Sequence, residues 1–135
     1  MSYFFIINPN AGGKYGDIRE RIERFFAGRK LRFEIEFTRA REHASELSAR
    51  AAMAGFARIV AAGGDGTIRE TAIPLIGKEA SLGILPCGSG NGLARNLYIQ
   101  LDFDAALECL LKWSPRKIDA GLANGRPFFC AAGVG

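Results

Sequence analysis

Residues 58–74 read RIVAAGGDGTIRETAIP and contain the junction on which the fold prediction depends. The mostly apolar run from Arg58 to Ala62 predicts a buried strand. Residues 63–66 are rich in glycine and predict a turn, and residues 67–73 then predict a short helix that Pro74 ends. A strand that leads through a glycine turn directly into a helix is typical of parallel α/β sheets.

The rest of the chain repeats this alternation of strands and helices. Apolar residues at strand spacing or helical spacing predict further strands at 3–8, 32–38 and 81–85, and helices at 17–28, 43–54 and 102–113. The strand at 32–38 alternates polar and apolar side chains, which is typical of a sheet edge. Because parallel neighbours need crossover connections, the sequence predicts an α/β fold, a parallel sheet with helices on both faces.

Residues 117–132 have a different pattern. Two runs suited to strands, 117–123 and 126–132, flank Asn124-Gly125, which supplies the positive φ angles of a type I′ turn. This pattern predicts an antiparallel hairpin. The last five residues contain no stop signal, so the chain is expected to be cut from a longer protein.

Composition favours a soluble, globular protein. The chain has 135 residues, 48% of them hydrophobic, and 18 Lys and Arg against 14 Asp and Glu give a net charge of +4. The three cysteines form no C-x-x-C pair, which argues against a disulfide framework or a zinc site. No basic stripe interleaved with aromatics suggests nucleic-acid binding, and no stretch approaches the roughly 20 apolar residues of a membrane span.

Glycine is over-represented, at 17 residues, and clusters after the predicted strands. In parallel α/β sheets ligands bind at the carboxyl ends of the strands, so these loops are expected to meet at one edge. Glycine lets the backbone approach an anion, and helix N-termini present N–H groups to it. The pattern therefore predicts a phosphate site, and its clusters are Gly12, Gly13 and Gly16; Gly63, Gly64 and Gly66; Gly88, Gly90 and Gly92.

The common phosphate motifs are absent. The chain has no Gly-x-x-x-x-Gly-Lys-Ser/Thr, and Gly88-x-Gly90-x-Gly92 does not match Gly-x-Gly-x-x-Gly. Walker ATPases and dinucleotide dehydrogenases are therefore disfavoured.

Four motifs instead occur together and in order. They are Asn8-Pro9-Asn10-Ala11-Gly12, Thr38 with His43-Ala44, Gly63-Gly64-Asp65-Gly66-Thr67-x-x-Glu70, and Pro86-x-Gly88-Ser89-x-Asn91. With these motifs the chain resembles the catalytic domain of the diacylglycerol kinase and sphingosine kinase family, which includes bacterial lipid kinases. NAD kinases and phosphofructokinases share the GGDG element, but four motifs in register are more specific than GGDG alone.

The resemblance implies an organisation and an activity. Residues 1–116 would form the α/β nucleotide-binding domain, similar to the N-terminal domain of NAD kinases and diacylglycerol kinases, and residues 117–135 the start of a truncated β-rich domain. The implied activity is ATP-dependent transfer of the γ-phosphoryl group to a lipid hydroxyl, of diacylglycerol or a sphingoid-like lipid, with Mg²⁺. The fragment alone is expected to be incomplete. A cytoplasmic location is expected, and any contact with the inner membrane surface is expected to be peripheral and transient.

The resemblance also implies roles for individual residues. Asp65 would act as the general base toward the acceptor hydroxyl or as a contact to Mg²⁺. Thr38 would contact ATP. The remaining implied nucleotide-binding residues are Asn8, Pro9 and Asn10; Gly63, Gly64, Asp65, Gly66, Thr67, Ile68 and Arg69 around the phosphates; and Glu70, Gly88, Ser89 and Gly90, which complete the pocket.

Two departures from the family pattern bear on the acceptor and on the phosphates. Gly92 stands where many diacylglycerol kinases have aspartate, and glycine at this position is closer to the sphingosine kinase pattern. Arg69 stands where Asn or His is common in the family.

Other interpretations of these residues stay open. The chain could be an NAD kinase-like enzyme, or a nucleotide-binding module without activity. Thr67-x-x-Glu70 also fits a helix capping box, Asp65 also fits a simple turn residue, and His43 is favoured as a local bonding or cap residue over a catalyst.

Overall fold

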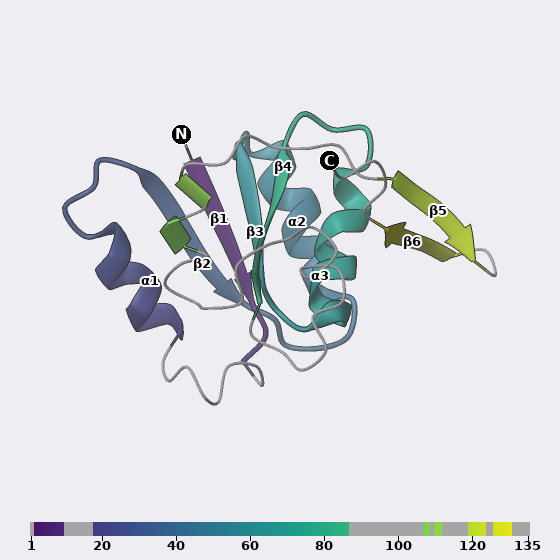
Figure 1. Cartoon of the computed structure of the whole chain (residues 1–135), viewed down its shortest axis with the longest axis horizontal. Coiled ribbons are helices and arrows are strands. Elements are labelled where there is room, and N and C mark those ends of the chain that lie inside the picture. The colour runs from purple at the N-terminus through teal and green to yellow at the C-terminus, as the bar shows by residue number, and fades with distance from the viewer. Residues whose placement is uncertain are drawn as a thin grey trace.

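The computed structural model describes residues 2–9, 18–86, 107–108, 110–111, 119–123 and 126–130. A four-stranded sheet has the order β2-β1-β3-β4, and each pairing in it is parallel (Figure 1). The strands are β1 (Ser2–Ile7), β2 (Arg32–Phe37), β3 (Arg58–Gly63) and β4 (Ser81–Pro86). They coincide with the predicted strands to within one residue at each end, and β2 lies at the edge of this sheet as its alternating pattern indicates.

Helices connect the parallel strands and cover both faces of the sheet. α1 (Ile18–Phe26) follows β1, α2 (His43–Met53) follows β2, and α3 (Asp65–Ala72) follows β3 and continues into a 3-10 turn, η2 (Ile73–Leu75). α1 packs on one face, while α2 and η2 pack on the other with α3 beside α2 (Figure 1). The predicted fold class, a parallel α/β sheet with helices on both faces, is confirmed.

One boundary differs in a way that affects the site. α3 begins at Asp65, two residues earlier than predicted, and Gly64 is its N-cap. Glycine is a poor helix former, which is why the prediction placed Gly66 in the turn. The packing of Thr67 and Ile68 outweighs that small cost, since Ile68 is fully buried. At the other end α3 stops at Ala72, because Pro74 cannot continue the helical hydrogen-bond pattern.

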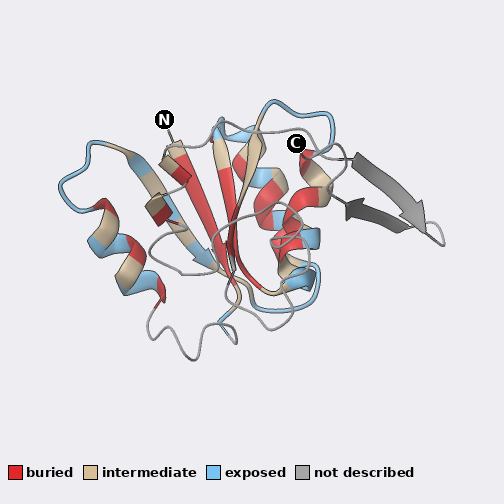
Figure 2. Cartoon of the chain, viewed as in Figure 1, coloured by how far each residue is buried: buried red, intermediate tan, exposed pale blue. Residues whose placement is uncertain are grey.

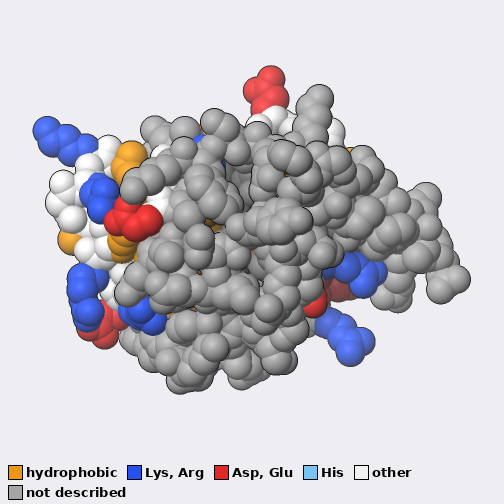
Figure 3. All heavy atoms as spheres, in the orientation of Figure 1, with side chains coloured by type: hydrophobic (Ala, Val, Ile, Leu, Met, Phe, Trp, Pro, Cys, Tyr) orange, Lys and Arg blue, Asp and Glu red, His pale blue; other side chains and the backbone are white. Residues whose placement is uncertain are grey.

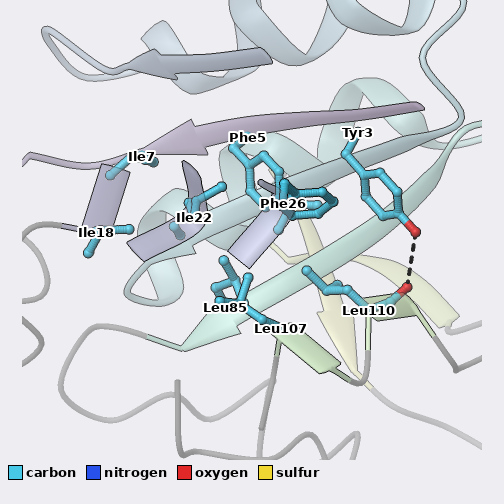
Figure 4. Close-up of a cluster of buried hydrophobic side chains, with 11 residues drawn as sticks. Tyr3, Phe5, Ile7, Ile18, Ile22, Phe26, Leu85, Leu107 and Leu110 are labelled. Atoms are coloured by element: carbon cyan, nitrogen blue, oxygen red, sulfur yellow. Dashed lines mark hydrogen bonds between the residues drawn. The ribbon is translucent and has the colours of Figure 1, made fainter. Parts of the chain in front are cut away.

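A first hydrophobic core lies between the sheet and α1. Side chains that alternate along β1 reach it, and the central strands β1 and β3 are almost wholly buried (Figure 2). Phe26 contacts the rings of Tyr3 and Phe5, at centroid distances of 5.4 and 5.5 Å. The buried members are Tyr3, Phe5, Ile7, Ile18, Ile22, Phe26, Val60, Ala62, Leu85, Leu107 and Leu110 (Figure 4).

A second core lies on the opposite face, between the sheet and α2. The even-numbered β1 residues Phe4 and Ile6 point into it, and Phe4 packs edge-on against Phe56 with centroids 5.2 Å apart. β2 contributes little here, since its residues on this face are charged and exposed. The buried members are Phe4, Ile6, Ala44, Leu47, Ala51, Phe56, Ile59 and Leu75.

The chain after β4 returns to the first core. Residues 107–108 and 110–111 are helical, and the rest of the helix predicted at 102–113 lies outside the described residues. The Leu110 carbonyl accepts a hydrogen bond from the Tyr3 hydroxyl at 3.4 Å (Figure 4). It also accepts one from Arg58 Nη1 at 3.0 Å. These bonds fix the returning segment against the amino halves of β1 and β3.

The predicted hairpin is confirmed as a separate two-stranded sheet. β5 (Asp119–Ala123) pairs antiparallel with β6 (Arg126–Cys130). The predicted turn, Asn124-Gly125, lies outside the described residues.

Two surface properties bear on partners. On α1, Arg19 pairs with Glu23 and Arg24 with Glu20, and basic and acidic side chains are interleaved over this end of the molecule (Figure 3). Within the ranges that the structure describes, no helix has the length and apolar character needed to cross a bilayer.

Candidate functional site

The carboxyl ends of the parallel strands meet at one edge of the sheet. Ile7 pairs with Phe37 of β2 and with Ala62 of β3, so β1, β2 and β3 end level with one another. The next residues continue the ladder: the Asn8 N–H donates to the Ala62 carbonyl at 3.0 Å, and the Thr38 N–H donates to the Ile7 carbonyl at 2.9 Å. The structure therefore brings Asn8, Thr38 and the Gly63 turn to the same edge.

Asn8 and Gly63 both contact Thr67, in the first turn of α3. A Cβ built on Gly63 would lie 2.8 Å from Thr67 Oγ1 and 2.9 Å from Thr67 Cβ, which is closer than Cβ atoms approach in folded proteins. Asn8 Nδ2 donates to Thr67 Oγ1 at 3.5 Å. Two predicted motifs that lie more than fifty residues apart are thus joined through Thr67.

The helix start at this edge is suited to an anion. Gly64 precedes α3, and its carbonyl accepts the first helical bond, from the Ile68 N–H at 3.1 Å. The first N–H groups of a helix have no acceptor within the helix, and the dipole adds a partial positive charge there. Asp65 and Gly66 in this turn are exposed, so a ligand can reach them.

The structure excludes the capping-box interpretation of Thr67-x-x-Glu70. That motif needs Thr67 at the N-cap, but α3 begins at Asp65, so Thr67 is its third residue. The Thr67 hydroxyl is directed at Asn8 instead. Thr67 therefore belongs to the contact between strand ends and helix, and the earlier start of α3 explains why the motif is misleading.

Ile68 differs in character from its neighbours in the motif. Its side chain is fully buried and its N–H is bonded to the Gly64 carbonyl. Arg69 is exposed and Glu70 is half-buried. Ile68 therefore anchors α3 in the core, while its neighbours Asp65, Gly66 and Arg69 are exposed.

The turn between β2 and α2 is held by local bonds. The His43 Nδ1 accepts the Arg39 N–H at 2.9 Å, and the His43 N–H donates to the Ala40 carbonyl at 3.2 Å. Glu42 adopts a left-handed φ of 66°, which lets the chain turn into α2. The prediction that His43 serves local bonding is confirmed, and the bonds fix the loop that begins at Thr38.

Several predicted site residues are not described. Asn10, Gly88, Ser89 and Gly90 lie outside the described residues, as does Gly92. Pro9 is described and exposed.

The side chains at this edge of the sheet are compatible with a metal ion that is bound together with a phosphate ligand. Among the residues described, no three or more His, Cys, Asp or Glu side chains are grouped as a metal-binding cluster. Mg²⁺ is usually held by one or two carboxylates together with substrate phosphates. Asp65 supplies one exposed carboxylate at the helix start, which fits Mg²⁺ bound to a polyphosphate better than a dedicated metal site.

Sequence reasoning missed Ser45 and Ser48 of α2. The Ser45 hydroxyl donates to the Glu70 carbonyl at 2.7 Å, and the Ser48 hydroxyl donates to the Thr71 carbonyl at 2.6 Å. Two features of the sequence are related to these bonds: Ser45 and Ser48 are three residues apart on a predicted helix, and Pro74 follows the helix of the GGDG motif. Neither feature identifies its partner without the fold.

The fold and this edge define a parallel α/β domain in which a glycine-rich strand–helix turn lies at the carboxyl ends of the strands. The family model of the diacylglycerol kinase catalytic domain matches residues 2–123. The chain therefore belongs to the diacylglycerol kinase catalytic domain family.

Curated relatives agree with this assignment. A Pseudomonas aeruginosa (strain UCBPP-PA14) protein named Probable lipid kinase YegS-like is 45% identical over 104 residues, covering 76% of this chain and 33% of that protein. A Pseudomonas putida protein of the same name is 38% identical over 124 residues, covering 90% of this chain and 39% of that protein. The chain thus spans between about a third and two fifths of the length of these relatives.

The fold also matches solved structures. A crystal structure of a diacylglycerol kinase from Bacillus anthracis strain Sterne superposes with a TM-score of 0.79 at 26% identity, covering 94% of this chain and 47% of that one. The agreement extends over nearly the whole of this chain.

Proposed function

We propose that this domain binds ATP, with Mg²⁺, at the carboxyl edge of the sheet and serves the transfer of the γ-phosphoryl group to a lipid hydroxyl. The observation that carries the proposal is the junction at Thr67, where Gly63 and Asn8 hold the start of α3 against the ends of two central strands. A helix start in this position directs N–H groups and a partial positive charge at a bound anion. Membership of a lipid kinase family supports ATP as that anion.

The proposed nucleotide contacts follow the motif residues at this edge. Gly63 to Thr67 and Arg69 would surround the phosphates, and Asn8, Pro9, Thr38 and Glu70 would line the rest of the pocket. Asn10, Gly88, Ser89 and Gly90 are assigned to the same pocket from the sequence alone. Ile68 would contribute by anchoring the helix that presents these groups.

Asp65 is the proposed acid–base group. Its carboxylate would accept the proton of the acceptor hydroxyl while that oxygen bonds to the γ-phosphorus and the bond to the ADP oxygen breaks. The alternative role is a contact to Mg²⁺, which when bound neutralises charge on the phosphate oxygens. Both roles require the exposed position that Asp65 has in the first turn of α3.

We also propose how this domain relates to the lipid. Residues 1–116 would form the nucleotide-binding domain, and the β5–β6 hairpin within residues 117–135 would begin a β-rich domain. The acceptor, diacylglycerol or a sphingoid-like lipid, lies in a membrane, so the protein would work from the cytoplasm at the inner membrane surface through a peripheral contact.

A transfer assay tests the proposal. The complete gene product is incubated with ATP labelled in the γ-phosphate and with diacylglycerol, a sphingoid base or NAD as acceptor. We expect label in a lipid, and a loss of at least about 10²-fold in the Asp65→Asn variant, the size typical of a general base. Label in NAD would instead identify an NAD kinase, and ATP binding without transfer to any acceptor would identify a nucleotide-binding module. Wild-type lipid phosphorylation by Asp65→Asn would overturn the role of Asp65.

A further inference from the structure

The C-terminal end of α3 is interrupted by a proline, which leaves a backbone carbonyl without its usual helical donor. In an unbroken helix the Glu70 carbonyl would accept the N–H of the residue four positions on, but that residue is Pro74, which has none. The Ile73 N–H closes the last regular bond, to the Arg69 carbonyl. The Glu70 carbonyl therefore needs a donor from outside the helix, and the Thr71 carbonyl also lies beyond the last regular bond of α3.

α2 supplies both donors. The Ser45 hydroxyl donates to the Glu70 carbonyl at 2.7 Å, and the Ser48 hydroxyl donates to the Thr71 carbonyl at 2.6 Å. Serines three residues apart lie on one face of a helix, so the two bonds are made side by side. Ser48 and Thr71 are fully buried, so water cannot replace the second bond.

The bonds continue from this end of α3 to its start. The Thr71 hydroxyl donates to the Thr67 carbonyl at 2.8 Å, and Thr67 Oγ1 accepts from Asn8 Nδ2 at 3.5 Å. A path of hydrogen bonds thus runs from Ser48 through Thr71 and Thr67 to the end of β1. Because α3 has only eight residues, a shift of its C-terminal turn also moves its N-terminal turn.

We propose that Ser45 and Ser48 are positioning residues for the phosphate-binding turn. By bonding the Glu70 and Thr71 carbonyls, they fix the position of α3 along its axis and its rotation about that axis. The first turn of this helix would then be placed to bind the nucleotide. They touch neither the nucleotide nor the acceptor. This inference rests on the proposed function for its effect on ATP, but the effect on the backbone of residues 64–69 can be measured separately.

The test compares serine variants in the complete gene product. Ser45→Ala, Ser48→Ala and the double variant each remove a donor, and the half-buried Ser45→Thr keeps one. The matched control is Ser2→Ala, because the Ser2 hydroxyl also bonds a distant backbone group, the Ala57 N–H at 3.0 Å, but at the opposite edge of the sheet. The readouts are the dissociation constant for Mg-ATP, measured well below the unfolding temperature, and amide hydrogen exchange of residues 64–69 without nucleotide.

A positioning role predicts a weaker affinity in protein that is still folded. We expect the double variant to raise the dissociation constant about tenfold, since small misplacements of positioned groups carry large costs, and to exchange faster at residues 64–69. Ser45→Thr and Ser2→Ala should keep wild-type values. A folded double variant with wild-type affinity overturns the proposal, even where its melting temperature falls. If the wild-type protein binds no ATP, the proposed function fails, and unchanged exchange at residues 64–69 would then overturn the positioning role separately.

Discussion

Gly63 and Thr67 are packed so closely that a methyl group on Gly63 would lie 2.8 Å from Thr67 Oγ1. The contact closes the turn between β3 and α3 and directs the start of the helix at the edge where the strands end. The packing therefore requires glycine at position 63, because any side chain there would overlap Thr67.

The first prediction concerns two glycines of the same motif. Gly63→Ala should lower the free energy of unfolding by about 1–3 kcal/mol, because Thr67 is β-branched and cannot move aside without strain. Gly66→Ala is the control: a Cβ there meets nothing within 4 Å, and alanine is the better helix former by about 1 kcal/mol. Urea unfolding of both variants should give changes of opposite sign. Equal changes would mean that the Gly63 contact is not a constraint.

The second prediction concerns the hydrogen bond between Asn8 and Thr67. The bond is long, at 3.5 Å, so its net worth is small. A double-mutant cycle with Asn8→Ala and Thr67→Val should give a coupling energy of about 0.5–1 kcal/mol in urea unfolding. Strictly additive variants would show that the two motifs are adjacent without being coupled.

The third prediction concerns the pH dependence of stability. Burial raises the pKa of the Tyr3 phenol above 10.0, and the nearby Arg58 guanidinium partly opposes this. The unfolded chain therefore loses this proton at a lower pH than the folded chain does, so the stability contributed by the neutral phenol is complete below pH 10.0 and declines above it. The free energy of unfolding should fall less steeply above that pH in Tyr3→Phe than in the wild type. Identical slopes in the two proteins would contradict this role.

The fourth prediction concerns the returning segment at Leu110. A Cβ on Gly83 would lie 2.8 Å from Leu110 Cδ2 and 3.1 Å from Val60 Cγ2. Gly83→Ala should therefore destabilise the domain by about 1 kcal/mol or more through overpacking. Leu110→Ala alone leaves a cavity, and the double variant should be more stable than the sum of the two single changes predicts. Additive losses would place Leu110 away from Gly83 in solution.

The sequence allowed most of the fold to be predicted because its signals are local. The apolar run of β1 and the alternation of β2 are patterns of a few consecutive residues, and both strands form where predicted. The runs on either side of Asn124-Gly125 likewise form β5 and β6. The start of α3 was missed, because the packing of Thr67 against Gly63 and Asn8 is a contact between distant segments that outweighs the poor helix propensity of Gly66.

The candidate site was predictable to the extent that its residues follow strands. Asn8, Thr38 and Gly63 come to one edge because parallel strands share their direction. The serine donors from α2 were not predictable, because which helix lies beside α3 is decided by the strand order β2-β1-β3-β4. A hydroxyl that bonds a distant carbonyl has no signature in its own segment.

We expect the turn between β3 and α3 to hold the phosphates of ATP. Amide hydrogen exchange of the complete gene product, measured with and without saturating Mg-ATP, is the sharpest test of this position. Exchange at residues 64–67 should slow when ATP binds, while exchange in α1 stays unchanged. If the protein binds ATP with no change in exchange at residues 64–67, the phosphates do not lie at this turn.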